Sequence, residues 1–320
     1  MYTHRSEGTS SLAPADAETV RVTEALAGSW ANRVAVRTGH VDLRAYYDEA
    51  IPDYPPALVP FADDPRYLAL QPDARARILA AAWVAYNEKT IDVEVSVVAP
   101  ACDLLLRGAF AGLDTTAFKR TVAQTQVDEQ FHVLMCLDGC LVARERHRIE
   151  SLRIPKSLAT RELDRAKSEC RSPRDAELVQ LAFATVAEVT INAYLDLVAN
   201  DAGIQPLNRE ITALHRRDES SHNKLFKEFT KAMFVHLDDA ERATYVRGLS
   251  SGLDAFVKMD FDAWRAILTE LGVPEAEDII HRCAVTGPAK RVVRDYSGFR
   301  ALLRDIGVLE EDIAFEFGSP

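Results

Sequence analysis

Hydrophobic positions recur with the 3.6-residue period of an α-helix over most of the chain, whereas the strict alternation typical of β-strands is rare. A proline-rich stretch over residues 42–69 breaks any long helix in that region. The long helical patterns that follow it cover residues 72–106, 115–148, 173–200 and 206 onward. Shorter helical patterns cover residues 157–170, 238–250, 253–272 and 297–307. The sequence therefore predicts an all-α protein.

Local signals mark where several of these helices begin. Asp114 or Thr115 can cap the second long helix, and Ser172 is a cap residue followed by proline at the first helical position. No low-complexity linker divides the chain, so we expect a single domain over residues 31–320. Residues 1–30 lack the apolar core of a signal peptide and are expected to form a flexible tail.

The composition limits the class of protein without identifying it. The 320 residues are 48% hydrophobic and carry a formal net charge of −11, so we expect a globular protein that binds neither nucleic acid nor an anionic membrane surface. No uninterrupted apolar run of the length of a bilayer is apparent, and no transmembrane helix is expected. The five cysteines form no paired framework, which favours reduced thiols and a cytoplasmic location.

Each long helical segment places acidic or imidazole side chains on its otherwise apolar stripe. In chain order they follow the pattern E, ExxH, E, ExxH, and the residues are Glu94, Glu129, His132, Glu188, Glu219 and His222. The glutamates of the first pair are 35 residues apart and those of the second pair 31, so helices that fold back would bring the acids together halfway along. Di-iron and di-manganese carboxylate bundles use this ligand set. We therefore predict a ferritin-like, ribonucleotide-reductase-like four-helix bundle core with additional helices.

The residue types suit a centre of two divalent ions. A carboxylate on an apolar stripe is costly to bury unless it is paired or bound to a metal, and four together repel one another unless cations neutralise them. Oxygen ligands with imidazole suit iron, or manganese in recombinant protein, and leave coordination positions open for dioxygen. A single ExxH arises by chance in many helices, but two that each follow an isolated inward glutamate are much harder to obtain by chance.

Three further residues extend this pattern. Asp128 and Asp218 each precede an ExxH glutamate, and each either accepts a hydrogen bond from the far nitrogen of a ligand histidine or is a surface acid. His215 lies one turn before the second ExxH motif, and it is either a seventh ligand or a buried histidine bonded to backbone. Glu88 competes with Glu94 on the first helix, but it lies about 120° away from the Glu94 face, so we prefer Glu94.

Several segments resemble the AurF-like family of di-iron arylamine N-oxygenases, and the resemblance spans roughly residues 40–305. The segments are WVAYNEKTIDVE, VDEQFH, VAEVTINAYL, HRRDESSH and VVRDYSG. The resemblance implies a homodimeric, non-haem di-iron enzyme that activates dioxygen as a peroxo species. Such an enzyme oxidises an aromatic amine through hydroxylamine and nitroso to nitro in antibiotic or other secondary-metabolite biosynthesis. The implied metal ligands are Glu94, Glu129, His132, Glu188, His215, Glu219 and His222.

The resemblance also implies a substrate pocket. Arg294, in VVRDYSG, matches an arginine expected to hold a substrate carboxylate, and the alternative is a surface arginine of the RVVR run. Asn192 and Tyr86 match positions that line the pocket. Three other positions differ from the family pattern, and they are Thr90, Val93 and Tyr194. The substrate is therefore either a substituted aminobenzoate or an amine that is not aromatic.

The reducing electrons must come from outside this chain, because no nicotinamide or flavin fingerprint and no four-cysteine cluster signature is present. We expect either an external ferredoxin or reductase, or the substrate's own oxidation intermediates, to supply the electrons. Two alternatives to N-oxygenation stay open. A di-iron enzyme of the same fold could catalyse C–H hydroxylation, desaturation or N–N bond formation, and a ferritin-like protein could bind iron without catalysing a reaction.

Overall fold

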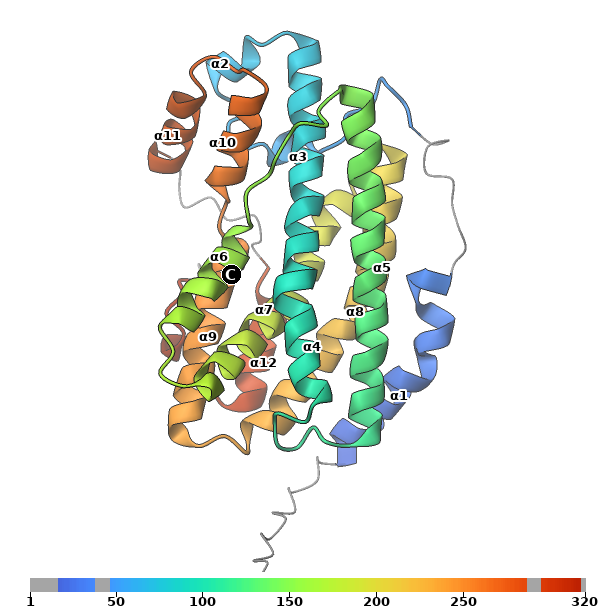
Figure 1. Cartoon of the computed structure of the whole chain (residues 1–320), viewed down its shortest axis with the longest axis vertical. Coiled ribbons are helices and arrows are strands. Elements are labelled where there is room, and N and C mark those ends of the chain that lie inside the picture. Colours follow the sequence, from blue (N-terminus) through green and yellow to red (C-terminus); the bar gives the residue numbers. More distant parts are fainter. Residues whose placement is uncertain (1–16, 38–46, 287–294, 318–320) are drawn as a thin grey trace, which may run out of the picture.

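The computed structural model describes residues 17–37, 47–286 and 295–317, and its core is a bundle of four long helical rods (Figure 1). The first rod is continuous through α3 (Pro72–Val93), a π-helical turn (Glu94–Val98) and α4 (Ala99–Leu106). The other rods are α5 (Thr116–His147), α7 (Pro173–Ala199) and α8 (Pro206–Phe234). No strand occurs in the described part of the chain, so the predicted all-α class is confirmed.

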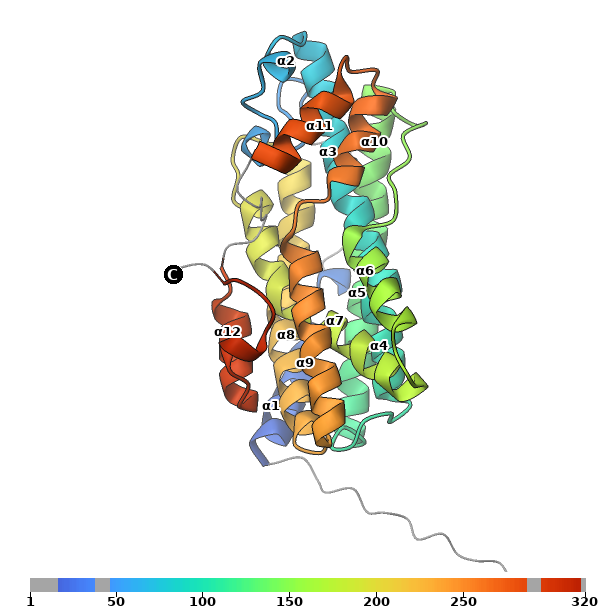
Figure 2. The same ribbon diagram turned by 90° about the vertical axis from the view of Figure 1, so that its left-hand side faces the viewer.

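Shorter helices surround this bundle. Along the bundle lie α6 (Leu158–Ser168), α9 (Asp239–Val257) and α12 (Ser297–Ile306), and Figure 2 shows α10 (Phe261–Glu270) and α11 (Ala276–Thr286) at one end beside α2 (Pro65–Leu68). Helix α9 packs closely along α7, because a Cβ atom on Gly248 would lie only 2.7 Å from the Cβ of Ala182. Helix α1 (Ala17–Arg33) and the short 3-10 helix η1 (Ala35–Arg37) lie outside α5 and α8. The remaining short 3-10 helices are η3 (Pro56–Leu58) and η5 (Glu310–Asp312).

The starts of the long helices follow from their cap residues. The Thr115 side chain, and not that of Asp114, accepts a hydrogen bond from the backbone nitrogen of Phe118 at the start of α5. Ser172 accepts one from the backbone nitrogen of Asp175 at the start of α7. Each side chain satisfies an amide that has no partner within its own helix, so both helix starts lie where the sequence predicts them.

The apolar core is divided into two clusters that meet near the middle of the bundle. One cluster contains the second half of the first rod and the first half of α5, with residues such as Val97, Leu105 and Val122. The other contains the first half of α3 and the second half of α5, with residues such as Trp83 and Met135. The buried acids and histidines predicted from the sequence lie where the two clusters meet.

The structure differs from the sequence-based predictions in several elements. The flexible tail predicted for residues 1–30 is wrong for residues 17–30, which belong to α1; residues 1–16 lie outside the described residues. Helix α9 extends further than predicted, and α11 was not predicted. Helix α7 is in fact long and apolar enough to cross a membrane, but 78% of its most apolar window is buried inside the bundle. Burial on all sides by neighbouring helices accounts for that apolar composition.

Candidate metal centre

The first rod carries Glu94, its predicted metal ligand, where the regular α-helix is interrupted. Glu94 is 4% exposed and begins the π-helical turn. Pro100 has no amide hydrogen, so the helix cannot continue its regular bonding to the carbonyl one turn earlier. The Gln180 side-chain amide of α7 instead donates to the carbonyls of Ser96 (3.2 Å) and Val97 (2.8 Å). A π-helical turn of this kind is frequent at functional sites, and here it is anchored to the neighbouring helix directly after Glu94.

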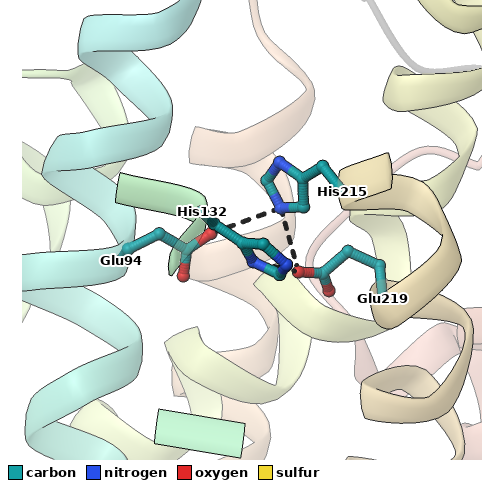
Figure 3. A group of neighbouring side chains, drawn as sticks. All are labelled: Glu94, His132, His215 and Glu219. Carbon is teal, nitrogen blue, oxygen red and sulfur yellow. Dashed lines mark hydrogen bonds and ion pairs between the residues drawn. The ribbon is translucent and has the colours of Figure 1, made fainter. Parts of the chain in front are cut away.

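Side chains from all four rods converge on two adjoining groups of ligand atoms. The atoms within each group lie within 4.8 Å of one another, and every residue is buried. The first group, drawn in Figure 3, consists of Glu94, His132, His215 and Glu219. The second group consists of Glu129, Glu188, Glu219 and His222. All seven residues that the resemblance assigned as ligands are thus brought together, and Glu219 belongs to both groups.

Many ligand atoms of this centre form no hydrogen bonds with one another, so they are available to bind cations. Among the described residues, five of these buried atoms have no hydrogen-bond partner: Glu94 Oε2, Glu129 Oε1, Glu188 Oε2, Glu219 Oε2 and His222 Nδ1. Two of them, His222 Nδ1 and Glu129 Oε1, are only 2.9 Å apart, yet their geometry is not that of a hydrogen bond. Buried polar atoms are normally satisfied, so a cluster of unsatisfied oxygen and imidazole donors fits two divalent metal ions.

The electrostatics lead to the same conclusion. Burial, Glu129 and Glu219 raise the pKa of Glu94 well above its usual range. Burial and the same two acids also raise the pKa of Glu188. Although burial disfavours the charged form of Glu129, the neighbouring His222 and His132 lower its pKa to about 2. Without metal the cluster therefore retains protons, and two divalent ions would take their place.

The two aspartates before the ExxH glutamates pair with the histidine ligands across the bundle. His132 Nε2, on α5, lies 3.4 Å from Asp218 Oδ2 of α8. His222 Nε2, on α8, lies 3.2 Å from Asp128 Oδ2 of α5. Each aspartate thus serves the histidine of the opposite motif, and both aspartates are fully buried and are not surface acids. An imidazole that donates from Nε2 presents Nδ1 to the metal, which is the arrangement expected of a metal-binding histidine.

A pocket opens directly beside the carboxylates. Its walls include Glu94, Glu188 and Glu219. Three of the residues predicted to contact substrate line it, and they are Thr90, Val93 and Tyr194. The pocket is mostly apolar, with the metal centre at one side.

The other predicted substrate residues lie elsewhere. Tyr86 lines a neighbouring pocket together with Tyr54 and Trp264. Asn192 lines a separate, open pocket between α7 and α8, where Arg216 and Arg217 also lie. Arg294 lies outside the described residues. The structure therefore brings three of the six predicted substrate residues to the wall of the pocket beside the metal centre.

Lys89 lies in the pocket wall, although it was not among the substrate-binding residues predicted from the sequence. It lines both the pocket beside the metal centre and the neighbouring one. Its Nζ atom lies 5.2 Å from the centre of the Tyr194 ring and 3.5 Å from the carbonyl oxygen of Phe256. Burial lowers the pKa of Lys89, while Asp260 opposes that effect. A cation held by an aromatic ring and one long hydrogen bond can bind an anionic group of a ligand.

This fold and this site define a class of protein, namely the helical bundles that hold a metal centre in a core of glutamate and histidine. A family model described as p-aminobenzoate N-oxygenase AurF matches residues 16–307. A protein from Streptomyces thioluteus described as 4-aminobenzoate N-oxygenase is 35% identical over 295 residues, which is 91% of this chain and 88% of that protein. The chain belongs to the AurF family, and it is an N-oxygenase enzyme of the metal-binding kind.

Proposed function

We propose that this chain is a non-haem di-iron N-oxygenase that oxidises an arylamine carboxylate through hydroxylamine and nitroso to nitro in secondary-metabolite biosynthesis. The observation that supports it most directly is the pocket that joins the buried Glu94, Glu188 and Glu219 to the Lys89 cation. A flat aromatic acid can place its amine beside the carboxylates and its own carboxylate beside Lys89. The 4-aminobenzoate N-oxygenase of Streptomyces thioluteus supports the same substrate class.

The chain's own residues would each have a defined part in this reaction. Glu94, Glu129, Glu188, Glu219, His132, His215 and His222 would hold the two ions, and Asp128 and Asp218 would fix the orientation of His222 and His132. A bound di-iron centre supplies the activation of dioxygen. Thr90, Val93 and Tyr194 would shape the space around the aromatic ring and exclude water from it.

The electron balance requires a partner. Converting the amine to a hydroxylamine consumes one dioxygen, two electrons and two protons and releases one water. An external ferredoxin or reductase is the proposed source of those electrons, because the sequence carries no flavin or nicotinamide fingerprint. Location in the cytoplasm, where such donors and reduced cysteines occur, is part of the same proposal.

Product analysis tests this function. The protein is loaded with Fe(II), the iron per chain is counted, and p-aminobenzoate is added with dioxygen and a reductant. Two irons per chain and a hydroxylamine, nitroso or nitro product would support the proposal. A ring-hydroxylated, desaturated or N–N-linked product would replace N-oxygenation by another reaction of the same centre. Many irons per chain without any product would favour iron storage.

A Lys89→Met variant is expected to lose preference for acids. The substitution keeps the length of the side chain but removes its charge, so KM for p-aminobenzoate should rise about 10- to 100-fold, the usual effect of losing a charged hydrogen bond. KM for the methyl ester of p-aminobenzoate should change little. Steady-state kinetics with both amines check this, with Lys156→Met, at a half-exposed lysine, as the control. If Arg294→Ala and not Lys89→Met removes the preference, Arg294 is the carboxylate-binding residue.

We also propose that the protein is a homodimer. Four large apolar side chains on α5 are 44–52% exposed, and they are Val127, Leu134, Leu137 and Leu141. A row of this kind on one helix is typical of a surface that a partner covers. Sedimentation velocity should give twice the 35.5 kDa chain mass, and Leu134→Glu should shift the species towards the monomer. A wild-type monomer at micromolar concentration would contradict this part of the proposal.

A further inference from the structure

The N-terminal helix has no part in the ligand set, yet it contacts the outside of both helices that carry an ExxH motif (Figure 1). We use the name N-terminal clasp for α1 and η1 together, residues 17–37. The Thr19 hydroxyl donates to Glu228 Oε2 of α8 at 3.1 Å. The Gln124 side chain of α5 donates to the carbonyl of Ala27 at 3.2 Å. The clasp is therefore fastened to both helices along its length.

The end of the clasp contacts the two aspartates that face the ligand histidines. The indole Nε1 of Trp30 donates to both oxygens of Asp128, at 2.9 and 3.0 Å. The backbone nitrogen of Ala35 lies 3.2 and 3.0 Å from the two oxygens of Asp218 and donates to them. Arg33 stands between Trp30 and Ala35 in the sequence, and its positive charge interacts favourably with both aspartates. Three groups within six residues of chain thus converge on the same pair of carboxylates.

Two short hydrogen-bonded chains result, and each runs from the clasp to a ligand histidine. One runs from Trp30 through Asp128 to His222 Nε2, where the last distance is 3.2 Å. The other runs from the Ala35 backbone through Asp218 to His132 Nε2, where it is 3.4 Å. A carboxylate that accepts a donor on both oxygens is fixed in its plane, so it holds the imidazole opposite in one tautomer and one orientation.

We infer that the N-terminal clasp positions two of the three histidine ligands, His132 and His222, from outside the bundle, with Trp30 and the Ala35 backbone as its positioning groups. This inference rests on the proposed metal centre. It gives Trp30 a role that packing alone would not require, because the indole nitrogen reaches the carboxylate behind His222 and not a neighbouring apolar group.

The two chains can be tested separately because one begins at a side chain and the other at the backbone. Trp30→Phe removes the indole N–H and keeps an aromatic ring, so only the chain to His222 is lost. His222 belongs to the ligand group that contains Glu129 and Glu188, whereas His132 belongs to the other group. Loss of an outer hydrogen bond of this kind typically weakens metal binding 10- to 100-fold, so one of the two sites should weaken by about that factor.

The experiment measures Mn(II) binding to the metal-free full-length protein by titration with electron paramagnetic resonance detection. Wild type should bind two ions, and Trp30→Phe should bind one with wild-type affinity and one about 10- to 100-fold more weakly. The control is Trp264→Phe, because the indole of Trp264 donates to the Met259 sulfur at 3.2 Å, away from the centre. That variant should bind both ions as wild type does, which separates a positioning effect from a general loss of stability.

The second arm is Ala35→Pro, which removes the backbone donor to Asp218 and should weaken the other site instead. Wild-type binding of two ions by Trp30→Phe would overturn the inference, and so would equal weakening in Trp30→Phe and Trp264→Phe. Binding of fewer than two ions by the wild-type protein would instead overturn the proposed di-metal function. The two failures are therefore distinguishable.

Discussion

A Glu219→Ala variant is expected to lose both metal ions and all N-oxygenation, although it removes a single side chain. Glu219 is the residue common to both ligand groups, so it would contribute to the binding of both ions. Its Oε1 atom lies 3.0 Å from His215 Nε2 and 3.4 Å from His132 Nδ1. The same atom lies 3.5 Å from His222 Nδ1. Without this carboxylate each group would lack one ligand, and two ions bound there would repel each other more strongly.

Metal analysis of the purified variant after Fe(II) loading checks this expectation, with far-UV circular dichroism to confirm that the helices persist. The matched control is Glu88→Ala on α3. Glu88 lies 2.9 Å from the Arg144 guanidinium and is 37% exposed, so it belongs to a surface ion pair and not to the centre. The control should keep two irons per chain. Two irons in Glu219→Ala, or loss of iron in Glu88→Ala, would contradict the assignment of Glu219 to both ligand groups.

The convergence of the buried acids and histidines could be predicted from the sequence because its signal is local. A helix has a fixed period, so an acid such as Glu188 within an apolar stretch must face the core. The spacing between acids then fixes where along the helices they meet. The structure confirms that these residues converge, and it confirms that Glu94 and not Glu88 faces inward. The pairing of each aspartate with the histidine of the opposite helix could not be predicted, because it depends on how α5 and α8 are rotated relative to each other.

The N-terminal helix was missed because its buried face is not hydrophobic. The residues of α1 that are buried are Thr19, Thr23 and Ala27, which have the i, i+4 spacing of a helix but are small or polar. A search for apolar periodicity cannot detect such a face. The helix is held by tertiary hydrogen bonds, notably from Trp30 to Asp128, and those depend on a partner 98 residues away.

Lys89 was missed for a different reason. A lysine beside Glu88 is usually a sign of a solvated helix surface, and the sequence gives no means of placing it at a pocket. In the structure, the aromatic ring of Tyr194 and the backbone of Phe256 on α9 surround the amine. Both come from elements far away in the chain, so only the packed structure shows that this cation faces the site.

The metal-free protein is expected to lose stability as the pH rises from 7 to 8.5, whereas the metal-loaded protein should not. Folding raises the pKa of Glu94 and the pKa of Glu188 well above the usual value of 4.5. Folding also raises the pKa of His132 from 6.5 to about 10. Burial disfavours the charged form of each group, so it raises the pKa of the two glutamates and by itself would lower the pKa of His132. The neighbouring Glu129 carboxylate outweighs the effect of burial on His132. His132 therefore keeps its proton in the folded state throughout this window, whereas an ordinary histidine in the unfolded chain has lost most of it.

Proton binding and folding stability are thermodynamically linked, so the difference in bound protons determines how stability changes with pH. Stability falls with rising pH wherever the folded state binds more protons, by about 1.4 kcal/mol per pH unit for each extra proton. For a chain of this size that corresponds to a decrease in Tm of about 2 °C per pH unit and proton. When metal is bound, the ligands have already lost these protons to the solvent, so Tm should be nearly independent of pH between 7 and 8.5.

Calorimetry of chelator-treated and Mn(II)-loaded protein at several pH values measures both slopes. His132→Asn provides the internal control, because the amide takes up no proton and should make the slope of the metal-free protein shallower. Metal should also raise the Tm of the wild-type protein by mass action, increasingly so as the pH rises, because protons then compete less for the ligands. Equal slopes with and without metal would mean that the buried carboxylates and histidines do not exchange protons for metal. In that case the metal ions would bind to other groups.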